Sequence, residues 1–195
     1  MSRYPNEREC LRILSDAGCT RRVLVHCCTV RAVAGEMASR LDVDQELVVA
    51  GALLHDLGRA VDHSILHAMV GADMARCIGL PDELVEIIRK HTGAGLDQTD
   101  IDELGLPQGD YIPRTLEEKT VAHADNLVSD NRVVTHTFSS EKLRKKGSFR
   151  GADRLDALHK DLSQQCGYDL DMMVELLGEY PELRGPCSAY GGKRR

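Results

Sequence analysis

The amino-acid sequence predicts an all-α fold in a single domain. Apolar residues recur at spacings of three and four over most of the chain, whereas the strict alternation that marks half-buried strands is nearly absent. A length of 195 residues suits one domain and is enough to bury a full core. Because no internal repeat interrupts this pattern, we expect residues 1–195 to form one helical domain.

The composition is that of an ordinary globular protein. A net charge of −6 and a hydrophobic content of 42% lack the basic excess of a dedicated nucleic-acid binder. No apolar run approaches the length of a membrane helix, and the segment MSRYPNEREC lacks the apolar core of a signal peptide. We therefore expect a cytoplasmic protein without membrane contact. The seven cysteines show no CxxC spacing and are interpreted as small buried residues.

The first two helices carry clear start signals. Asn6 and Glu9 form a capping box for a helix that Gly18 can close. Thr20 can cap a second helix, whose apolar positions follow helical spacing. These positions are Val23, Cys27, Val30, Ala34 and Met37.

Three more helices are expected before residue 92. The third extends from about Asp44 to Leu54, and the fourth from about Leu66 to Ile78, where Gly79 ends it. Pro81 marks the start of the fifth helix, which is rich in leucine, valine and isoleucine.

The second half of the chain has a weaker helical pattern. Residues 92–114 are dense in Gly, Pro and Asp and predict a long excursion with one short helical turn. A capping box at Thr115 begins a helix that should continue to about Arg132. After the polar segment 139–151, one or two further helices are expected over about 152–178, followed by a loose tail at 185–195.

Several polar residues lie on faces that these helices would bury. His26, His91 and Asp125 each lie three or four residues from apolar positions of their helix. Each has an ordinary explanation alone, since a core histidine can be satisfied by hydrogen bonds and Asp125 could pair with an arginine. A buried carboxylate otherwise needs a cation. Together with His55 and Asp56 at the end of the third helix and His67 at the start of the fourth, they make six N/O ligand candidates for a metal site in the bundle core. The six are His26, His55, Asp56, His67, His91 and Asp125.

The order of these residues, with the doublet in LLHDLGR, resembles the HD superfamily of metal-dependent phosphohydrolases in its HDIG-type branch. The segments HAMVGADMA and IIRKHTGAG match the same branch, and the chain, including PRTLEEKTVAHADNL, is similar to small archaeal HD proteins. The resemblance covers an HD core at about 20–135 and leaves a C-terminal helical extension at about 139–180.

The resemblance implies a site with one or two metal ions. One ion would be held by His26, His55, Asp56 and Asp125, and Asp56 would bridge to a second ion held by His67 and His91. Imidazole and carboxylate ligands suit Mn, Fe, Co, Ni or Zn, while Mg, which remains possible, prefers more oxygen. Two such ions would share a hydroxide that attacks a phosphoryl group.

Two residues near the doublet are candidates for contact with the substrate. Arg59 would face the mouth of the site and neutralise phosphate, unless it forms a surface ion pair with Asp62 or Asp56. His63 would protonate the leaving oxygen, unless it is an exposed loop residue.

The substrate expected from the resemblance is a nucleotide or a related phosphoester. Cyclic-di-GMP phosphodiesterases of the HD-GYP type carry a further histidine where this chain has Thr92, and no GYP occurs here. HD-type hydrolases of diadenosine tetraphosphate share the His-Thr pair, so dinucleoside polyphosphates are an option. Ribonuclease Y shares the HDIG core but adds a membrane anchor and an RNA-binding domain, which we do not expect here. An RNA phosphodiesterase or a non-catalytic nucleotide-binding module are the alternatives.

One dense basic run lies in the extension. It is expected to be a solvated helix face, although a phosphate-steering lid or a weak RNA contact would also use such charges. The run consists of Lys142, Arg144, Lys145, Lys146 and Arg150. Two Phe and five Tyr offer little for base stacking along a single strand. The histidines His123, His136 and His159 fall outside the ligand pattern.

Overall fold

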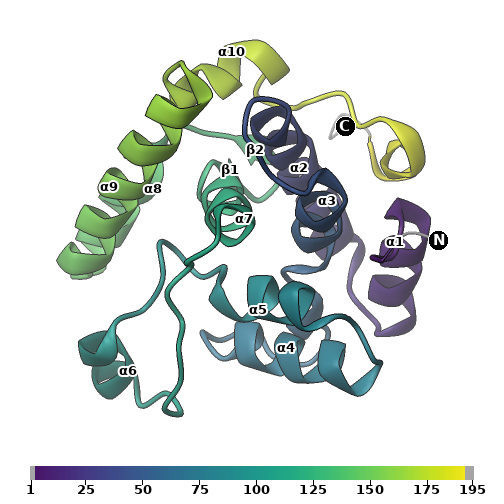
Figure 1. Cartoon of the computed structure of the whole chain (residues 1–195), viewed down its shortest axis with the longest axis horizontal. Coiled ribbons are helices and arrows are strands. Elements are labelled where there is room, and N and C mark those ends of the chain that lie inside the picture. Colours follow the sequence, from purple (N-terminus) through teal and green to yellow (C-terminus); the bar gives the residue numbers. More distant parts are fainter. Residues whose placement is uncertain (1–2, 192–195) are drawn as a thin grey trace.

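The computed structural model describes residues 3–191 and confirms the all-α class. Helix α2 (Arg21–Ala38) and helix α7 (Leu116–Asn126) lie next to each other at the centre, and α3 (Gln45–Leu54) packs against both (Figure 1). Helices α4 (His67–Cys77) and α5 (Asp82–Lys90) form a pair below them, and α1 (Glu7–Asp16) packs on α3. The core therefore surrounds α2, α3 and α7.

The predicted start signals of the first helices are confirmed. The Asn6 side chain accepts hydrogen bonds from the backbone N–H groups of Arg8 and Glu9, and Glu9 accepts one from the Asn6 N–H at 2.8 Å. Thr20 accepts a bond from the Val23 N–H. All five apolar positions expected to form the stripe of α2 are buried, so helical spacing identified the correct face.

Gly58 lies in a short 3-10 helix, η1 (Leu57–Ala60), which links the third helix to α4. A Cβ atom at Gly58 would lie 2.0 Å from the carbonyl oxygen of His67 and 2.5 Å from the backbone nitrogen of Gly71. Gly58 is not among the glycines with positive φ. Glycine is thus needed at position 58 because the backbone of α4 lies too close to leave room for a side chain.

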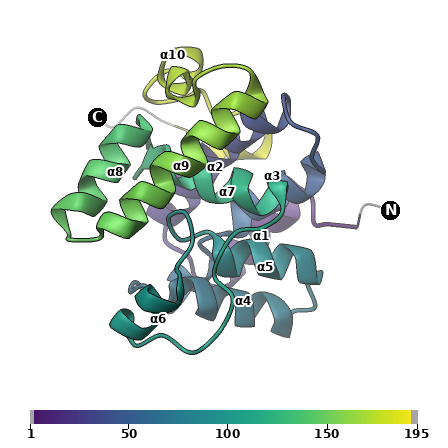
Figure 2. The same cartoon turned by 60° about the vertical axis from the view of Figure 1, so that its left-hand side comes forward.

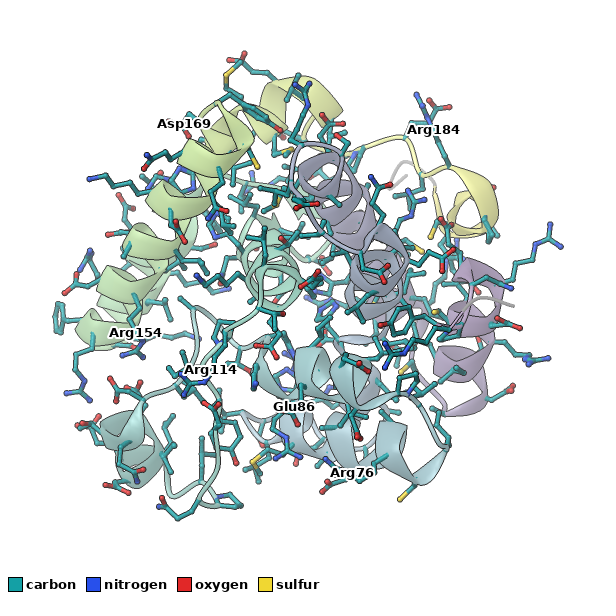
Figure 3. The ribbon with its side chains drawn as sticks, viewed as in Figure 1. Arg76, Glu86, Arg114, Arg154, Asp169 and Arg184 are labelled. Atoms are coloured by element: carbon teal, nitrogen blue, oxygen red, sulfur yellow. The ribbon has the colours of Figure 1, made fainter. Side chains whose placement is uncertain are left out.

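The 92–114 excursion contains one short helix, α6 (Gln98–Leu104), as expected. Ile101, Leu106 and Tyr111 form a small apolar cluster of their own, which packs against residues at the start of α4. Arg154 ties the excursion to α9 (Phe149–Cys166), because its guanidinium donates to Asp97 at 2.6 Å and also bonds Asp100 (Figure 3). The excursion is therefore anchored at two places.

The prediction that the helix at Thr115 continues to Arg132 is wrong. Helix α7 ends at Asn126 and is followed by a small antiparallel hairpin of β1 (Val128–Ser129) and β2 (Arg132–Val133). The turn between the strands places Asp130 in the left-handed region, with φ 63. Aspartate tolerates this conformation better than most residues because its short side chain can bond the nearby backbone.

The C-terminal part is more regular than the sequence predicted. The polar segment 139–151 lies mostly in helix α8 (His136–Lys145), which forms a hairpin with α9 at one side of the molecule (Figure 2). A short 3-10 helix, η2 (Leu170–Met172), leads into α10 (Met173–Leu177). The expected loose tail at 185–195 contains a further 3-10 helix, η3 (Gly185–Tyr190), in which Cys187 is buried. Residues 192–195 of that expected tail lie outside the described residues.

The basic run is exposed, as expected of a helix face, but its arginines are already paired. Arg144 bonds Asp153 at 2.8 Å and Asp156 at 2.6 Å, and Arg150 bonds Glu103 at 2.9 Å. These pairs join α8 to α9 and α9 to α6, so the two arginines are engaged within the fold. Six of the seven cysteines are buried, Cys77 being the exposed one. Within residues 3–191, no helix has the length and apolar character needed to cross a membrane.

Candidate metal centre

The six candidate ligands meet in the core, although they come from five segments of the chain. His26 lies on α2, His55 ends α3, and Asp56 precedes η1. His67 opens α4, His91 ends α5, and Asp125 lies in the last turn of α7. His55, Asp56, His67 and His91 are buried, while His26 and Asp125 are partly exposed.

Asp56 stands between two groups of imidazoles. Its Oδ2 atom lies 3.8 Å from Nε2 of both His26 and His55. Its Oδ1 atom lies 3.2 Å from Nε2 of His67 and 3.6 Å from Nε2 of His91. A carboxylate placed in this way can bridge two ions, one at each oxygen.

Asp125 belongs to the first of these groups. Its Oδ1 atom lies 3.0 Å from Nε2 of His26 and 3.6 Å from Nε2 of His55. The second group consists of the two imidazoles on the Oδ1 side of Asp56. Two groups of three among these residues could hold an ion, His26 with His55 and Asp125, and His55 with Asp56 and His91, so the two groups share His55.

The four imidazoles share one arrangement of hydrogen bonds. Each Nδ1 atom donates to a backbone carbonyl oxygen at 2.7 or 2.8 Å. The acceptors belong to Asp130, Ala52, Ser64 and Ile88, for His26, His55, His67 and His91 in that order. A carbonyl can only accept, so these bonds place a proton on Nδ1 and leave Nε2 as the ring nitrogen that can bind a metal ion when it carries no proton. Fixing the outer ring nitrogen in this way is how proteins prepare metal-ligating histidines.

The inward-facing Nε2 atoms lie close to one another and to the carboxylate oxygens of Asp56 and Asp125. They lie 3.2 Å apart in the pair His26–His55 and 3.0 Å apart in the pair His67–His91. Two lone pairs at such distances repel unless a proton or a metal ion lies between them. The donor set thus fits divalent ions bound by nitrogen and carboxylate oxygen. Groups of three such residues within this set could each hold an ion.

The electrostatics of the site also favour a cation. Burial raises the pKa of Asp56, but His55 and the neighbouring imidazoles outweigh it and hold the pKa well below its usual range. Burial lowers the pKa of His55, but Asp56 and Asp125 outweigh it and raise the pKa to about 9. The carboxylates that attract a proton to His55 also attract a divalent ion. The carboxylates of Asp56 and Asp125 stay ionised at neutral pH and can serve as ligands.

Arg59 and His63 lie at the mouth of the site. The mouth is a cavity of about 360 Å³ that Arg22, His26 and Asp56 also line. The Nε atom of Arg59 donates to both carboxylate oxygens of Asp56, at 2.9 and 2.8 Å, so the expected alternative of an ion pair with Asp56 is present. The side chain is still 31% exposed, so its outer nitrogens can reach a ligand. His63 is exposed at the rim, and its carbonyl oxygen accepts from Arg59.

Asp130 is a site residue that sequence reasoning missed. Its carbonyl oxygen fixes the ring of His26, and its carboxylate accepts from Nε of Arg22 at 2.8 Å. The only signal was the polar triplet Ser-Asp-Asn at 129–131, which is typical of a turn. Asn126 has a related role, because its amide donates to the carbonyl oxygen of Gly93 and joins the end of α7 to the segment after His91.

A second cluster of histidines joins the C-terminal elements to α7. Nε2 of His123 lies 3.1 Å from Nδ1 of His159, and Nδ1 of His136 lies 2.8 Å from a carboxylate oxygen of Asp171. Asp169, at the far end of α9 in Figure 3, bonds the other ring nitrogen of His159 at 3.0 Å. The rings of His136 and His159 are stacked, with centroids 3.6 Å apart and an angle of 14°. Ligand atoms of His136, His159 and Asp171 lie within 4.8 Å of one another. Because both ring nitrogens of His159 already bond protein partners, we interpret this cluster as structural.

Comparison with known proteins gives a match over the region that holds the site. The family model described as HD domain matches residues 23–130, which include all six candidate ligands. No solved structure matches the chain.

Curated relatives include proteins named for action on RNA. The chain is 43% identical over 167 residues to a tRNA (cytidine(56)-2'-O)-methyltransferase of Picrophilus torridus, covering 86% of this chain and 49% of that protein. It is 43% identical over 133 residues to an uncharacterised protein of Methanocaldococcus jannaschii, covering 66% and 79%. It is 41% identical over 158 residues to a ribonuclease Y of Desulfotalea psychrophila, covering 80% and 27%. The chain thus spans about half the length of the methyltransferases that it matches.

Proposed function

This chain belongs to the HD-domain family, and on that premise we propose that it is a metal-dependent phosphohydrolase acting on a nucleotide or a related phosphoester. The observation that carries the proposal is the set of four imidazole Nε2 atoms held inward around both oxygens of Asp56. Imidazole nitrogen together with carboxylate oxygen is a donor set that divalent transition metals favour. We also propose that the chain falls in the HDIG-type branch, which the LLHDLGR segment supports.

The ligands divide between two ions. His26, His55 and Asp125, with one oxygen of Asp56, would hold the first. His67 and His91, with the other oxygen of Asp56, would hold the second. Mn, Fe, Co, Ni or Zn suits these donors. Bound ions of this kind polarise a phosphoryl oxygen and lower the pKa of water enough to supply a nucleophile at neutral pH.

The residues of the chain bind and orient the substrate at the mouth. Arg59 is held by Asp56 through Nε and donates from Nη1 to the His63 carbonyl oxygen, so the remaining N–H groups of its terminal nitrogens could bond phosphate oxygens. Arg22 lies across the same cavity and adds a second positive charge. His63 at the rim lines the same cavity and would be the group that donates a proton to the leaving oxygen.

RNA is a second candidate substrate, supported by the names of the relatives. Ribonuclease Y and the tRNA methyltransferases both act on RNA by name. A phosphodiester of RNA would use the same ions and the same mouth. We do not propose methyl transfer, because that name describes proteins of which this chain spans only about half.

The test combines metal analysis with a panel of phosphoesters. Protein purified without chelator should contain one to two transition-metal ions per chain and hydrolyse at least one substrate among mononucleotides, dinucleoside polyphosphates, cyclic dinucleotides and short RNA. EDTA should abolish hydrolysis, and Mn, Fe, Co or Ni should restore it. Asp56→Asn should remove most of the metal, whereas Asp73→Asn, at an exposed aspartate of α4, should not.

Two results would contradict the proposal. A protein that holds no metal after incubation with Mn and Ni would exclude the metal-dependent mechanism. A metal-loaded protein that is inert across the panel but binds a nucleotide tightly would instead be a nucleotide-binding regulatory module.

A further inference from the structure

We propose that the large pocket along α2 beside the metal centre binds the nucleoside part of the substrate. The pocket has a volume of about 790 Å³, and we define it by α2, the β1–β2 turn and the C-terminal segment 180–191. The inference rests on the proposed function, in which the phosphate group lies at the metal centre. It names the rest of the substrate as a sugar with an aromatic base.

The pocket and the mouth follow one another along the same face of α2. Arg22 and His26 line the mouth, whereas Val25 and Thr29 line the pocket. These positions are three or four apart and therefore share one side of the helix. Arg22 and Thr29 are seven positions apart, which corresponds to a rise of about 10 Å along the helix. A nucleoside phosphate can cover this distance between its phosphate and the far edge of its base.

The turn of the β-hairpin lies over the boundary between the two cavities. Asp130 lines the mouth, and the next residue, Asn131, lines the pocket. The same turn fixes the ring of His26 through the Asp130 carbonyl. A substrate that occupies both cavities would thus contact this turn, with its phosphate near Asp130 and its nucleoside near Asn131.

The lining of the pocket differs from that of the mouth in charge. The mouth contains Arg22 and Arg59, each already paired with an aspartate of the same lining, so a phosphate there would meet guanidinium donors as well as the proposed ions. The ten residues that line the pocket include no lysine or arginine, and Glu182 is their one acid. A second phosphate would therefore be unfavourable there, whereas an uncharged group is accepted.

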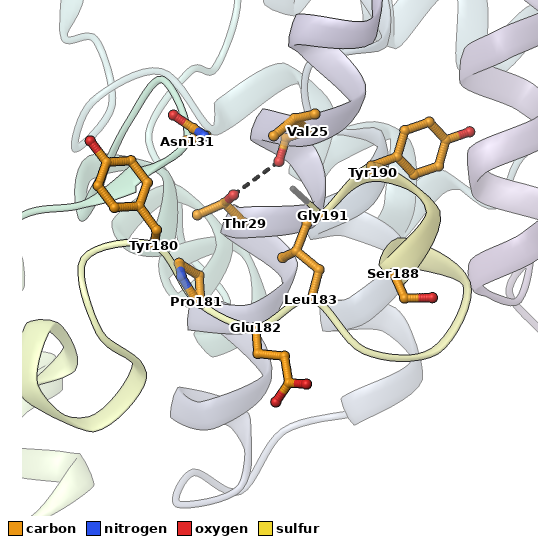
Figure 4. A pocket seen from close by; sticks show the side chains of 10 residues that line it. All are labelled: Val25, Thr29, Asn131, Tyr180, Pro181, Glu182, Leu183, Ser188, Tyr190 and Gly191. Atoms are coloured by element: carbon orange, nitrogen blue, oxygen red, sulfur yellow. Dashed lines mark hydrogen bonds between the residues drawn. The ribbon is translucent and has the colours of Figure 1, made fainter. Parts of the chain in front are cut away.

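The polar and aromatic groups of the pocket suit a base. Tyr180 and Tyr190 lie towards opposite ends, with Val25 and Thr29 between them (Figure 4). A tyrosine ring provides a stacking surface for any base, and the Asn131 amide offers a donor and an acceptor to the edge of a base. One stacking platform for one nucleoside needs few aromatic residues, in contrast to a groove for a long single strand.

Contacts of the surrounding structure position the backbone next to Tyr180 and the ring of Tyr190. The Val133 N–H donates to the carbonyl oxygen of Glu179 at 2.8 Å, which attaches the residue before Tyr180 to the hairpin. The guanidinium of Arg21 lies over the ring of Tyr190, 5.8 Å from its centroid. The pocket is thus prepared by contacts that exist without a ligand.

The first experiment measures binding without catalysis. Protein stripped of metal with EDTA is titrated by calorimetry with adenosine, guanosine, cytidine, uridine and their 5′-monophosphates. At least one of these nucleosides and its 5′-monophosphate should bind, and Tyr180→Ala should raise the Kd of both about 5-fold or more through loss of stacking. Tyr180→Phe should restore the original Kd. Phe149→Ala is the matched control, since Phe149 is 61% exposed and Tyr180 is 62% exposed, and it should leave Kd unchanged.

The second experiment measures hydrolysis by the metal-loaded protein. Tyr180→Ala should raise KM for the best mononucleotide and leave KM for p-nitrophenyl phosphate, which has no nucleoside, unchanged. The ratio of kcat/KM for the two substrates should therefore fall by about 5-fold or more. A parallel assay with short RNA identifies the source of the nucleoside. If Tyr180→Ala raises KM for the mononucleotide alone, the pocket binds a free nucleotide. If the variant raises KM for RNA as well, the pocket binds the terminal nucleotide of an RNA chain.

The outcomes separate this inference from the proposed function. No binding of any nucleoside or nucleotide to the stripped protein, or an unchanged Kd in Tyr180→Ala, overturns the assignment of the pocket even if hydrolysis is found. Binding that Tyr180→Ala weakens supports the pocket even if the metal-loaded protein hydrolyses nothing.

Discussion

Gly58, two residues after Asp56, shows how a single position can control the site. A Cβ atom there would overlap the backbone of α4 at His67 and Gly71. The substitution Gly58→Ala should therefore push α4 away and move His67 from its place beside Asp56.

We expect Gly58→Ala to lower the free energy of unfolding by about 1–3 kcal/mol, as other overpacked cores do. Gly35→Ala is the control, because the nearest atom to its Cβ would be a terminal nitrogen of Arg31 at 4.0 Å. In the interior of α2 this change should stabilise the protein by about 0.5–1 kcal/mol. Urea unfolding of both variants checks this, and equal stability of Gly58→Ala and the original chain would show that α4 adapts without cost.

His67 and His91 decide whether the site holds one ion or two. Both Nε2 atoms face Oδ1 of Asp56, while the remaining ligands face its other side. With two ions, His67→Ala and His91→Ala should each remove up to one ion per chain by elemental analysis, and turnover should fall steeply. The first ion should persist in both variants, since its own ligands are untouched. Full metal content and near-normal turnover in both variants would leave a mononuclear site.

At the residue scale, the sequence predicted the site better than its surroundings. Histidines and aspartates on apolar helical faces stand out because their burial has to be compensated, and all six candidate ligands lie together in the structure. The backbone carbonyls that fix the imidazoles could not be predicted. Every residue has a backbone carbonyl, so the residue type does not reveal which one will accept such a bond. The carbonyl that binds His26 belongs to Asp130, which lies in a turn that was predicted to be part of a helix.

At the scale of elements, the errors occur where local signals are weak. Residues 115–132 keep helical spacing past Asn126, so only the Ser129–Asn131 triplet marks the turn. The bounds of helix α8 could not be predicted because Ser140 is its one buried residue, so it has no apolar stripe. Ion pairs from Arg144 to Asp153 and Asp156 hold it on α9 instead. Charge pairs between neighbouring helices leave no periodic pattern in a sequence.

The histidine cluster that joins α7 to α9 and η2 should make the fold sensitive to acid. Burial lowers the pKa of His123 to about 3, and burial together with His136 lowers the pKa of His159. An unfolded histidine has a pKa of about 6.5 and so binds a proton more readily than these folded ones. Their contribution to stability is therefore full above about pH 6.5 and is lost as the pH falls towards about 3.

His123→Leu should reduce this loss between pH 7 and pH 5, because leucine has no charge to gain. Urea midpoints at both values, measured with EDTA present, give the comparison. His63→Gln is the control, since His63 is exposed, and it should keep the acid sensitivity of the original chain. The same drop in stability for His123→Leu and the original chain would show that other groups cause it.

At the scale of the whole molecule, the candidate centre joins segments that are distant in sequence. Its ligands come from α2, the ends of α3 and α5, the start of α4, and α7. The order of these helices could be predicted from capping boxes and apolar spacing, but their convergence could be expected only from the family resemblance. A buried Lys90–Glu118 pair, at 3.0 Å, also fixes α5 against the start of α7.

A site assembled from the whole fold should couple metal binding to global stability. Ions that bind the folded chain, and not the unfolded one, stabilise it by about 2.7 kcal/mol when their free concentration is 100 times Kd. For a chain of this size that corresponds to a rise in Tm of roughly 5–10 °C. We expect this difference between Mn-loaded and EDTA-treated protein by calorimetry. Asp56→Asn should lose the difference, because the bridging carboxylate is gone, while Asp73→Asn should keep it. Equal Tm values with Mn and with EDTA would mean that the converged imidazoles bind no ion, so hydrogen bonds to backbone carbonyls and the charge of Arg59 would have to hold them in place.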